Sequence, residues 1–288
     1  MDHVAERVHR VLEPIHAMIN FTPELQDTLT GIGLRPGRMP AFASRIAPLG
    51  AVTLGAVAGI FYTFNPELMG RFFPRAWTLA SPEDIVAGRL TAVDVSLRRL
   101  LGAETIASAE LAEAAALARE AAGGCFAAGR PMYAAQEALG WPEEPHLALW
   151  HAATLLREFR GDGHVAVLVS KGLDPLTALI THTATGSGFF EPAAKLLRGW
   201  SDEQWAEAQR KVQDQGLIDG SGALTDQGTA LRQELEDATN RLTERPWQTL
   251  GTEKADRLHD LAEGFAKQIV AAGAYPDGIF ADQHFIDS

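Results

Sequence analysis

The residues best suited to chemistry lie on the helix predicted over residues 146–160. His151, Thr154 and Glu158 are spaced three and four positions apart, so a helix with about 3.6 residues per turn brings them to one face. The other side chains of this helix are mostly leucine, alanine, tryptophan and phenylalanine. Polar side chains in such apolar surroundings must either form hydrogen bonds within the protein or take part in binding or catalysis. Two interpretations stay open: a structural hydrogen-bond ladder and the wall of a binding site.

Five ionisable side chains surround two glycines at residues 157–164, directly after this stripe. The glycines predict a break, with Asp162 capping a second helix over residues 163–171. His164 would then lie in the first turn, where the positive end of the helix dipole keeps an imidazole neutral and able to act as a general base. A role as helix cap explains an aspartate at position 162 but does not explain a histidine at position 164. The predicted catalytic residues are His164, Glu158 and Asp162.

Further candidates come from the N-terminal half of the chain. His16 lies on an otherwise apolar predicted helix, and Arg45 directly precedes a long uncharged run. A lone buried histidine is more often a satisfied core residue than a ligand-binding one, and that interpretation stays open for His16. We expect a pocket between the two halves of the chain that binds a small polar or anionic molecule. The predicted substrate-binding residues are His16, Arg45, His151, Arg160, Asn20, Trp77 and Thr154.

The sequence has no pattern typical of a metal or cofactor site. It lacks an HExxH motif, a glycine-rich phosphate loop and a GxSxG motif. Its only cysteine, Cys125, excludes an intrachain disulfide and is expected to be a small buried thiol. His146 and His151 are five positions apart and point to different faces of a helix, which argues against a zinc pair. We therefore expect no metal and no cofactor.

Composition limits the partners of the chain. The 288 residues carry a formal net charge of −12, which disfavours binding to nucleic acid and to anionic membranes. We expect a small-molecule partner and no membrane, and the sequence is compatible with a homodimer. The first eleven residues are charged rather than apolar, so we expect no signal peptide and a cytoplasmic location.

One segment has nearly the length of a membrane helix. Residues 46–64 contain no charged side chain. The run nevertheless includes a proline and several glycines and is rich in alanine. This composition favours a close-packed buried helix over a membrane span.

Helical signals dominate the first hundred residues. Apolar side chains from Val4 to Ile19 recur at the three- and four-residue spacing of a helix with one buried stripe. A capping residue followed by proline and glutamate then predicts the start of further helices. This signature begins at Thr22, Asn65 and Ser81.

The C-terminal pattern predicts a winged helix. A capped helix over residues 201–215 ends at a glycine, two short apolar segments flank the turn at residues 220–222, and a long helix begins at Asp226. Helix, two-stranded wing and helix in this order is typical of winged-helix proteins. We therefore predict a mainly α fold: a helical N-terminal domain, residues 1–142, packed on a C-terminal winged-helix (MarR-like) domain, residues 143–288, with a small two-stranded wing.

The predicted winged helix is poorly suited to reading DNA. A DNA-binding winged helix needs Lys and Arg on the helix before the wing and on the wing itself. Between Ser201 and Glu244 ten acidic residues stand against four basic ones, and the wing tip contains no Lys or Arg. The module could instead serve as a dimerisation or scaffold element, because a fold does not fix a function.

Four blocks of the sequence carry a family resemblance. They are EPIHA at residues 13–17, RIAPLG at 45–50, LWHAATLLRE at 149–158 and RGDGH at 160–164. They resemble the signature of a bacterial helix-turn-helix (winged-helix) family of unknown function, and the likeness covers nearly the whole chain. More distantly, this family is similar to the proteins that form the aziridine ring in azinomycin-type biosynthesis by eliminating sulfate.

That distant similarity implies roles for the candidate residues. Donors that would hold a leaving sulfate are Arg45, His16, Arg160 and His164. Glu158 or Asp162 would take the amine proton. We therefore predict a cofactor-independent enzyme of secondary metabolism, a lyase or cyclase that closes a ring or performs an elimination. The alternatives are a ligand-responsive winged-helix transcription regulator and a non-catalytic ligand-binding or scaffold protein.

Overall fold

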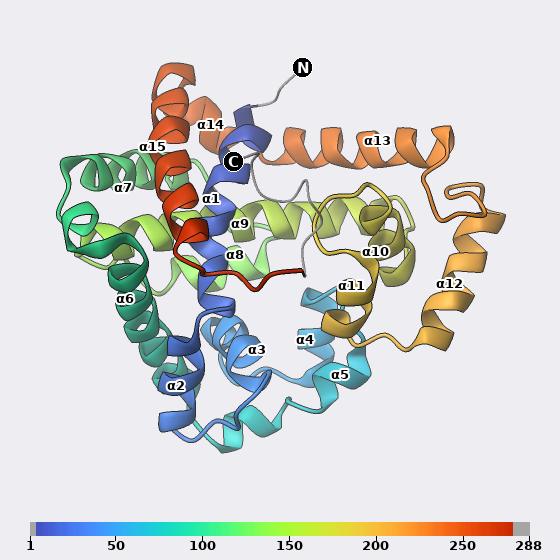
Figure 1. Ribbon diagram of the computed structural model, residues 1–288, viewed down its shortest axis with the longest axis horizontal. Coiled ribbons are helices and arrows are strands. Elements are labelled where there is room, and N and C mark those ends of the chain that lie inside the picture. The colour runs from blue at the N-terminus through green and yellow to red at the C-terminus, as the bar shows by residue number, and fades with distance from the viewer. Residues whose placement is uncertain (1–3, 279–288) are drawn as a thin grey trace. The chain divides into compact units, whose positions relative to one another are not determined.

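The computed structural model describes residues 4–278 and is mainly helical over this range (Figure 1). Its helices group into two compact units. Within the described residues, the first unit consists of 4–53, 72–162 and 242–276. The second consists of 54–71, 163–241 and 277–278. These units interleave along the chain. The division into domains at residue 142 stays a prediction.

The first unit is an array of α-helices with short 3-10 turns. Helix α1 packs on α15, α2 packs on α6, and α7 packs on both α14 and α15. Its elements are α1 (Val4–Ala17), η1 (Met18–Asn20), α2 (Pro23–Gly31), α3 (Met39–Ile46), η2 (Ala47–Leu49), η3 (Arg75–Thr78), α6 (Pro82–Ile106), α7 (Ala109–Ala122), α8 (Pro131–Glu137), α14 (Arg245–Leu250), α15 (Thr252–Ala271) and the first part of α9 (Pro145–Ser170).

Helix α1 confirms the apolar stripe expected from its spacing. Val8, Val11 and Ile15 are at most 1% exposed. The opposite side of the helix carries charged residues, so burial of one face holds α1 in place. Two buried or half-buried residues of α1, Glu13 and His16, are polar and contribute to the site described below.

The proline caps are confirmed as helix starts. The Asn65 side chain accepts a hydrogen bond from Glu67 N at the start of α5, and Ser81 Oγ accepts one from Asp84 N at the start of α6. Thr22 precedes α2, but its side chain does not cap the helix. Its hydroxyl lies 3.0 Å from Ser96 Oγ instead.

The second unit contains the C-terminal helical module. Its helices are α4 (Leu54–Ile60), α5 (Pro66–Gly70), the end of α9, α10 (Pro175–Thr183), α11 (Glu191–Arg198), α12 (Asp202–Asp214) and nearly all of α13 (Asp226–Leu242). Its core contains Ile180 of α10, Ala194 of α11, and Trp205 and Val212 of α12. A capping box at Ser201 and Gln204 starts α12, as the sequence predicts.

The predicted break after residue 160 is wrong. Helix α9 runs without interruption from Pro145 to Ser170, through both glycines. Asp162 therefore does not cap a new helix, and His164 lies inside a helix, away from the N-terminal end of its dipole. The Asp162 side chain accepts a hydrogen bond of 3.0 Å from Tyr133 N, in the first turn of α8. Glycine within a helix is unfavourable by only about 1 kcal/mol, which packing outweighs.

The predicted two-stranded wing is not confirmed. Residues 217–225 form a tight loop with a single isolated antiparallel bridge between Ile218 and Leu224, and no strand is found within residues 4–278. Two backbone hydrogen bonds hold the loop, from Asp219 N to Ala223 O at 2.8 Å and from Thr225 N to Leu217 O at 3.1 Å. The segment is too short to extend this pairing into strands.

The prediction of one buried helix over residues 46–64 is also wrong. The run is divided between η2 and the short helix α4, and Val57 is the buried residue of α4. Among the described residues, no single helix is long and apolar enough to cross a membrane. The bent pair Met39–Leu49 and Leu54–Ile60 passes that test by length and composition.

Close packing at Gly228 gives the first testable prediction. A Cβ atom there would lie 2.0 Å from Leu217 O, so α13 approaches the loop at residues 217–225 too closely for any side chain. We expect Gly228→Ala to lower the free energy of unfolding by about 1–3 kcal/mol. Gly264→Ala is the control, because a Cβ on that exposed face of α15 meets nothing within 4 Å. It should stabilise by about 0.5–1 kcal/mol. Chemical denaturation measures both, and equal effects would contradict the packing argument.

Candidate functional site

Glu158 is the most deeply buried ionised group of the stripe on α9. Its side chain is 2% exposed and faces Arg45 at the end of α3. Arg45 Nε donates to Oε1 at 2.9 Å and Nη2 donates to Oε2 at 3.0 Å, which is a bidentate pair. Burial alone would raise the pKa of Glu158, but Arg45 and Arg157 lower it to about 2. This carboxylate is therefore ionised at neutral pH.

His16 joins the stripe through Thr154. Thr154 Oγ1 donates to Trp150 O at 2.9 Å, so its single proton is used. His16 Nδ1, 3.0 Å from the same oxygen, must then carry the proton and donate to it. Nε2 is left as the acceptor nitrogen of a neutral ring. Burial lowers the pKa of His16 to about 4, so the ring stays neutral at pH 7.

Two further residues of α1 extend this group. Glu13 Oε2 lies 3.5 Å from Arg157 Nε and 3.9 Å from His9 Nε2. Burial raises the pKa of Glu13, but Arg157 and neighbouring charges lower it to about 2, and burial lowers the pKa of His9 to about 3. We call the six residues together the charge cluster. Its members are His9, Glu13, His16, Arg45, Arg157 and Glu158.

Gly161 makes room for the charge cluster. A Cβ atom at this position would lie 2.8 Å from Arg157 Nη1 and 3.7 Å from Glu158 Oε2. Any larger residue would therefore displace the Arg157 guanidinium from the carboxylates that it neutralises. The glycine that suggested a helix break thus has a packing reason inside a continuous helix.

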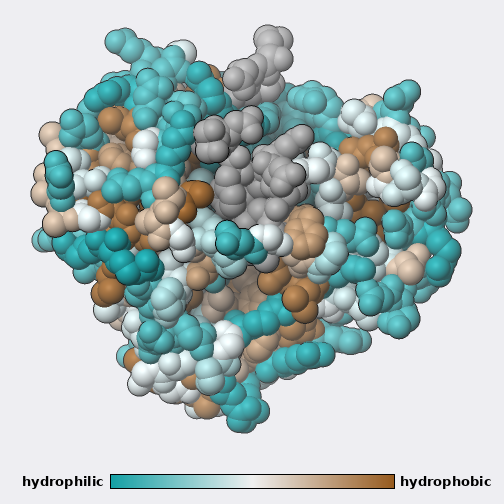
Figure 2. Space-filling model, viewed as in Figure 1, coloured by the Kyte–Doolittle hydropathy of each residue, from teal (hydrophilic) through white to brown (hydrophobic). Residues whose placement is uncertain are grey.

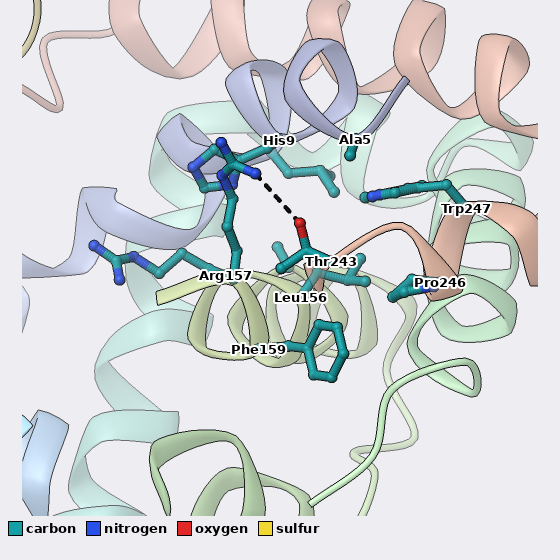
Figure 3. A pocket seen from close by; sticks show the side chains of 11 residues that line it. Ala5, His9, Leu156, Arg157, Phe159, Thr243, Pro246 and Trp247 are labelled. Atoms are coloured by element: carbon teal, nitrogen blue, oxygen red, sulfur yellow. Dashed lines mark hydrogen bonds between the residues drawn. The ribbon is translucent and has the colours of Figure 1, made fainter. Parts of the chain in front are cut away.

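A small pocket adjoins the charge cluster within the first unit (Figure 3). Its polar lining comes from His9 on α1, Arg157 and Arg160 on α9, and Thr243 after α13. Arg160 Nη1 donates to Thr243 Oγ1 at 3.3 Å, the dashed line of Figure 3. The apolar walls are Ala5, Leu12, Ala153, Leu156, Phe159, Pro246 and Trp247. The walls enclose about 310 Å3, including the open mouth, and the space left free holds about one water molecule.

The structure thus brings together four of the predicted substrate-binding residues. His16, Arg45 and Thr154 belong to or contact the charge cluster, and Arg160 lines the pocket. His151 packs edge-on against Trp141, and burial lowers its pKa to about 4.

Asn20 and Trp77 have partners of their own. Asn20 Nδ2 donates to Ala17 O at 3.3 Å, and Trp77 Nε1 donates to Val52 O at 2.9 Å. Neither residue lines the pocket.

The three predicted catalytic residues have separate partners. Glu158 is paired with Arg45, and Asp162 holds the start of α8. Burial raises the pKa of Asp162 to about 6. His164 belongs to the second unit, where its Nδ1 lies 2.9 Å from Thr239 Oγ1. No interaction in the described structure tests a catalytic role for them, so these roles stay predictions.

Sequence reasoning missed several residues of this site, among them His9 and Glu13. With the predicted His16 they are spaced four and three positions apart, which is the same one-face pattern that identified the stripe on α9. This spacing is visible in the sequence and predicts that the three side chains share one face of the helix. Thr243 and Trp247 gave no signal, because only the fold brings them beside α1 and α9.

Metal-binding side chains are not grouped in the described part of the chain. Among residues 4–278 no three His, Cys, Asp or Glu side chains are placed to hold a metal ion. Cys125 is half-buried, and burial raises its pKa to about 12, so the thiol stays protonated and unreactive at neutral pH.

Comparison with known families identifies the chain. A family model described as "Helix-turn-helix family" matches residues 5–276. The chain belongs to this helix-turn-helix family. No curated protein and no solved structure matches it. Family membership confirms the helix-turn-helix resemblance, whereas the similarity to aziridine-forming proteins stays a prediction.

In this member of the helix-turn-helix family, the charge cluster makes stability depend on pH. His9 and His16 have folded-state pKa values of about 3 and 4, below the ordinary value of 6.5. The unfolded state therefore binds more protons below pH 6.5, so stability is full above that pH and falls as pH decreases. Glu13 and Glu158 add a second loss between pH 4.5 and 2, because their pKa values are also lowered.

We expect the free energy of unfolding to fall by on the order of 1 kcal/mol per histidine between pH 7 and pH 5. Urea denaturation followed by circular dichroism measures this loss. The double variant His9→Gln/His16→Gln should show a shallower pH dependence than the wild type, and His259→Gln, outside the cluster, is the control. The lowered pKa of His151 contributes to the pH dependence of all three proteins. Identical slopes in the wild type and the double variant would refute the assignment.

Proposed function

We propose that this helix-turn-helix family protein binds a small molecule through an anionic group at the pocket of the first unit. One observation carries the proposal: Arg157 and Arg160, three positions apart on α9, line the same pocket with His9 and Thr243. No carboxylate is among its lining residues in the described chain. Two guanidinium groups, an imidazole and a hydroxyl form a donor set suited to a carboxylate, sulfate or phosphate.

The surroundings favour an anion for electrostatic reasons. Phe159, Leu156 and Trp247 form apolar walls, which lower the local dielectric and strengthen charge-assisted hydrogen bonds. Glu13 and Glu158, the two carboxylates of the charge cluster, are paired with Arg157 and Arg45. The free space is small, and a bound head group would require the long arginine side chains to shift.

The same pocket would serve the enzyme that the sequence predicts. Elimination or ring closure needs a base whose pKa lies near the working pH. With a pKa of about 3, His9 is a poor base and is better suited to hydrogen bonding. Asp162, with a pKa of about 6, is better matched to proton transfer, although it does not line the pocket. The predicted catalytic roles of Glu158 and His164 stay proposals. Ligand binding is the step that this enzyme shares with the non-catalytic alternatives.

The substitution Arg160→Gln tests the proposal. It removes one guanidinium from the pocket, and unlike loss of Arg157 it leaves both buried glutamates with their cations. We expect binding of sulfate, phosphate or acetate, measured by titration calorimetry, to weaken at least tenfold, or about 1.4 kcal/mol. Arg210→Gln, which removes the same charge from the exposed surface of α12, is the control. Unchanged affinity in Arg160→Gln, or no binding by the wild type, would refute the proposal.

Native mass spectrometry of the purified full-length protein identifies the ligand class. A co-purifying metabolite with an acidic group that is lost in Arg160→Gln would name it. Incubation of that metabolite with the wild type then separates the enzyme from a binding protein. A change in its mass or structure supports catalysis, and unchanged release supports binding alone.

A second candidate is a ligand-responsive transcription regulator, which family membership favours. The consecutive helices α10, α11 and α12 supply the helical core that such a module needs. The exposed surface of α12 opposes it, because Asp202, Glu203 and Glu207 precede the basic pair Arg210 and Lys211. This surface is strongly hydrophilic (Figure 2).

Fluorescence anisotropy with the DNA upstream of the protein's own coding sequence tests the regulator. We expect no specific complex at physiological salt, and at most weak binding that disappears as salt increases, because acidic residues repel phosphates. Competition with unrelated DNA of equal length is the control. Sequence-specific binding in the nanomolar range would establish the regulator in place of our expectation.

A further inference from the structure

A groove lies within the second unit and shares no lining residue with the pocket of the first unit. It is formed by the residues that follow α9, the first turn of α10, the last turn of α12 and the first turns of α13. All of its lining residues lie between positions 171 and 234, so it belongs to one unit. Its volume is about 610 Å3, and small-molecule sites usually measure about 300–1,000 Å3.

Three leucines form the apolar floor of this groove. Leu173 and Leu217 are 7% and 8% exposed, and they belong to two different apolar clusters of the second unit. Leu231 of α13 packs against both clusters. All three side chains line the groove. The groove therefore lies where the two clusters meet, and the apolar part of a ligand would leave water on contact with this floor.

The charged residues of the groove are already paired. Lys171 Nζ forms an ion pair with Glu234 Oε1, and Lys211 Nζ donates to Asp174 Oδ2 at 2.6 Å. These two lysines and two carboxylates are the charged lining residues, so their formal charges sum to zero. A charged ligand would have to compete with a partner that is already bound. The groove therefore favours an uncharged ligand.

Two side-chain amides supply hydrogen-bonding capacity without charge. Gln215 follows α12 and Gln227 lies in the first turn of α13, and both line the groove. Neither side-chain amide forms a hydrogen bond with another residue of the described range 4–278. A primary amide can both donate and accept, which suits a carbonyl, hydroxyl or amide group of a ligand.

We propose that this groove binds an uncharged organic molecule that has an apolar ring system or chain and at least one hydrogen-bonding group. The apolar part would lie on the leucine floor, and the polar group would bind Gln215 or Gln227. This site goes beyond the proposed function, because it lies in the other unit and takes a ligand of different charge. Either site can exist without the other.

Fluorescence titration of the full-length protein tests the proposal. The probe is the uncharged dye prodan, a naphthalene with a ketone group, whose emission moves to shorter wavelength in apolar surroundings. We expect saturable binding with this shift. The anionic dye anilinonaphthalenesulfonate is the comparison, and it should bind at least about fivefold more weakly, because a chain of net charge −12 repels it and the lysines are paired.

The variant Ala230→Trp locates the site. Ala230 is exposed on α13 and lines the groove, so an indole there would occupy the space of the ligand without disturbing the core. We expect the affinity for prodan to fall at least about tenfold, since the groove is filled. Ala206→Trp is the matched control, because Ala206 is exposed on α12 and does not line the groove.

The variant Gln227→Leu tests the polar contact. It keeps the approximate size of the side chain and removes the amide, so prodan should bind at least about threefold more weakly. Gln233→Leu, at an exposed position of α13 outside the groove, is the control. If Ala230→Trp does not fold, this pair of variants still locates the site.

Three results would overturn the proposal. The first is the absence of saturable prodan binding to the wild type. The second is binding that neither Ala230→Trp nor Gln227→Leu weakens relative to its control, which would place the dye elsewhere. The third is binding of the anionic dye as tight as that of prodan, which would contradict the preference for an uncharged ligand.

Discussion

The buried negative charge of Glu158 is the constraint on which the helix packing of the first unit depends. An ionised group that is 2% exposed is tolerated only when opposite charge and hydrogen bonds compensate for its lost hydration. Arg45 provides both through a bidentate contact from α3, and Arg157 adds a second positive charge from the preceding position of α9. Removing either carboxylate or cation alone would leave a buried charge uncompensated, so the helices that carry them are fixed relative to one another within this unit.

This constraint also sets the chemistry of the neighbouring side chains. Burial and nearby arginines keep His9 and His16 neutral at physiological pH. A neutral imidazole can donate one hydrogen bond and accept another, and with pKa values of about 3 and 4 these two rings are weak bases. They are therefore better suited to recognition than to proton abstraction. The site also contains arginines, and an arginine side chain keeps its positive charge in proteins. The cluster and its pocket therefore combine fixed positive charge with neutral hydrogen-bonding groups, and this combination is the physical basis for preferring an anionic ligand.

Local sequence signals predicted the helices well and their interruptions poorly. The stripe of α1, the caps at Asn65 and Ser81, and the capping box at Ser201 each depend on contacts within a few residues. Gly161 predicts a break, but α9 continues, and the lack of a side chain at this position leaves room for the Arg157 guanidinium on the preceding turn. The loop at residues 217–225 was expected to form two strands, but only one bridge forms. At Gly161 tertiary packing outweighed the local propensity, whereas the loop at residues 217–225 is short and its pairing does not extend beyond the bridge.

The candidate site was predictable only in part, for a related reason. One face of α9 could be deduced from spacing, and it correctly grouped Thr154 with Glu158. The partners of these residues could not be deduced from spacing, since Arg45 and Glu158 are 113 positions apart in the sequence and meet only in the fold. Spacing also failed where a helix continues from one unit into another: His164 follows the stripe directly in sequence but bonds to Thr239 in the second unit. The residues on one polar face of a long helix therefore form a single site only over the part of the helix that lies in one unit.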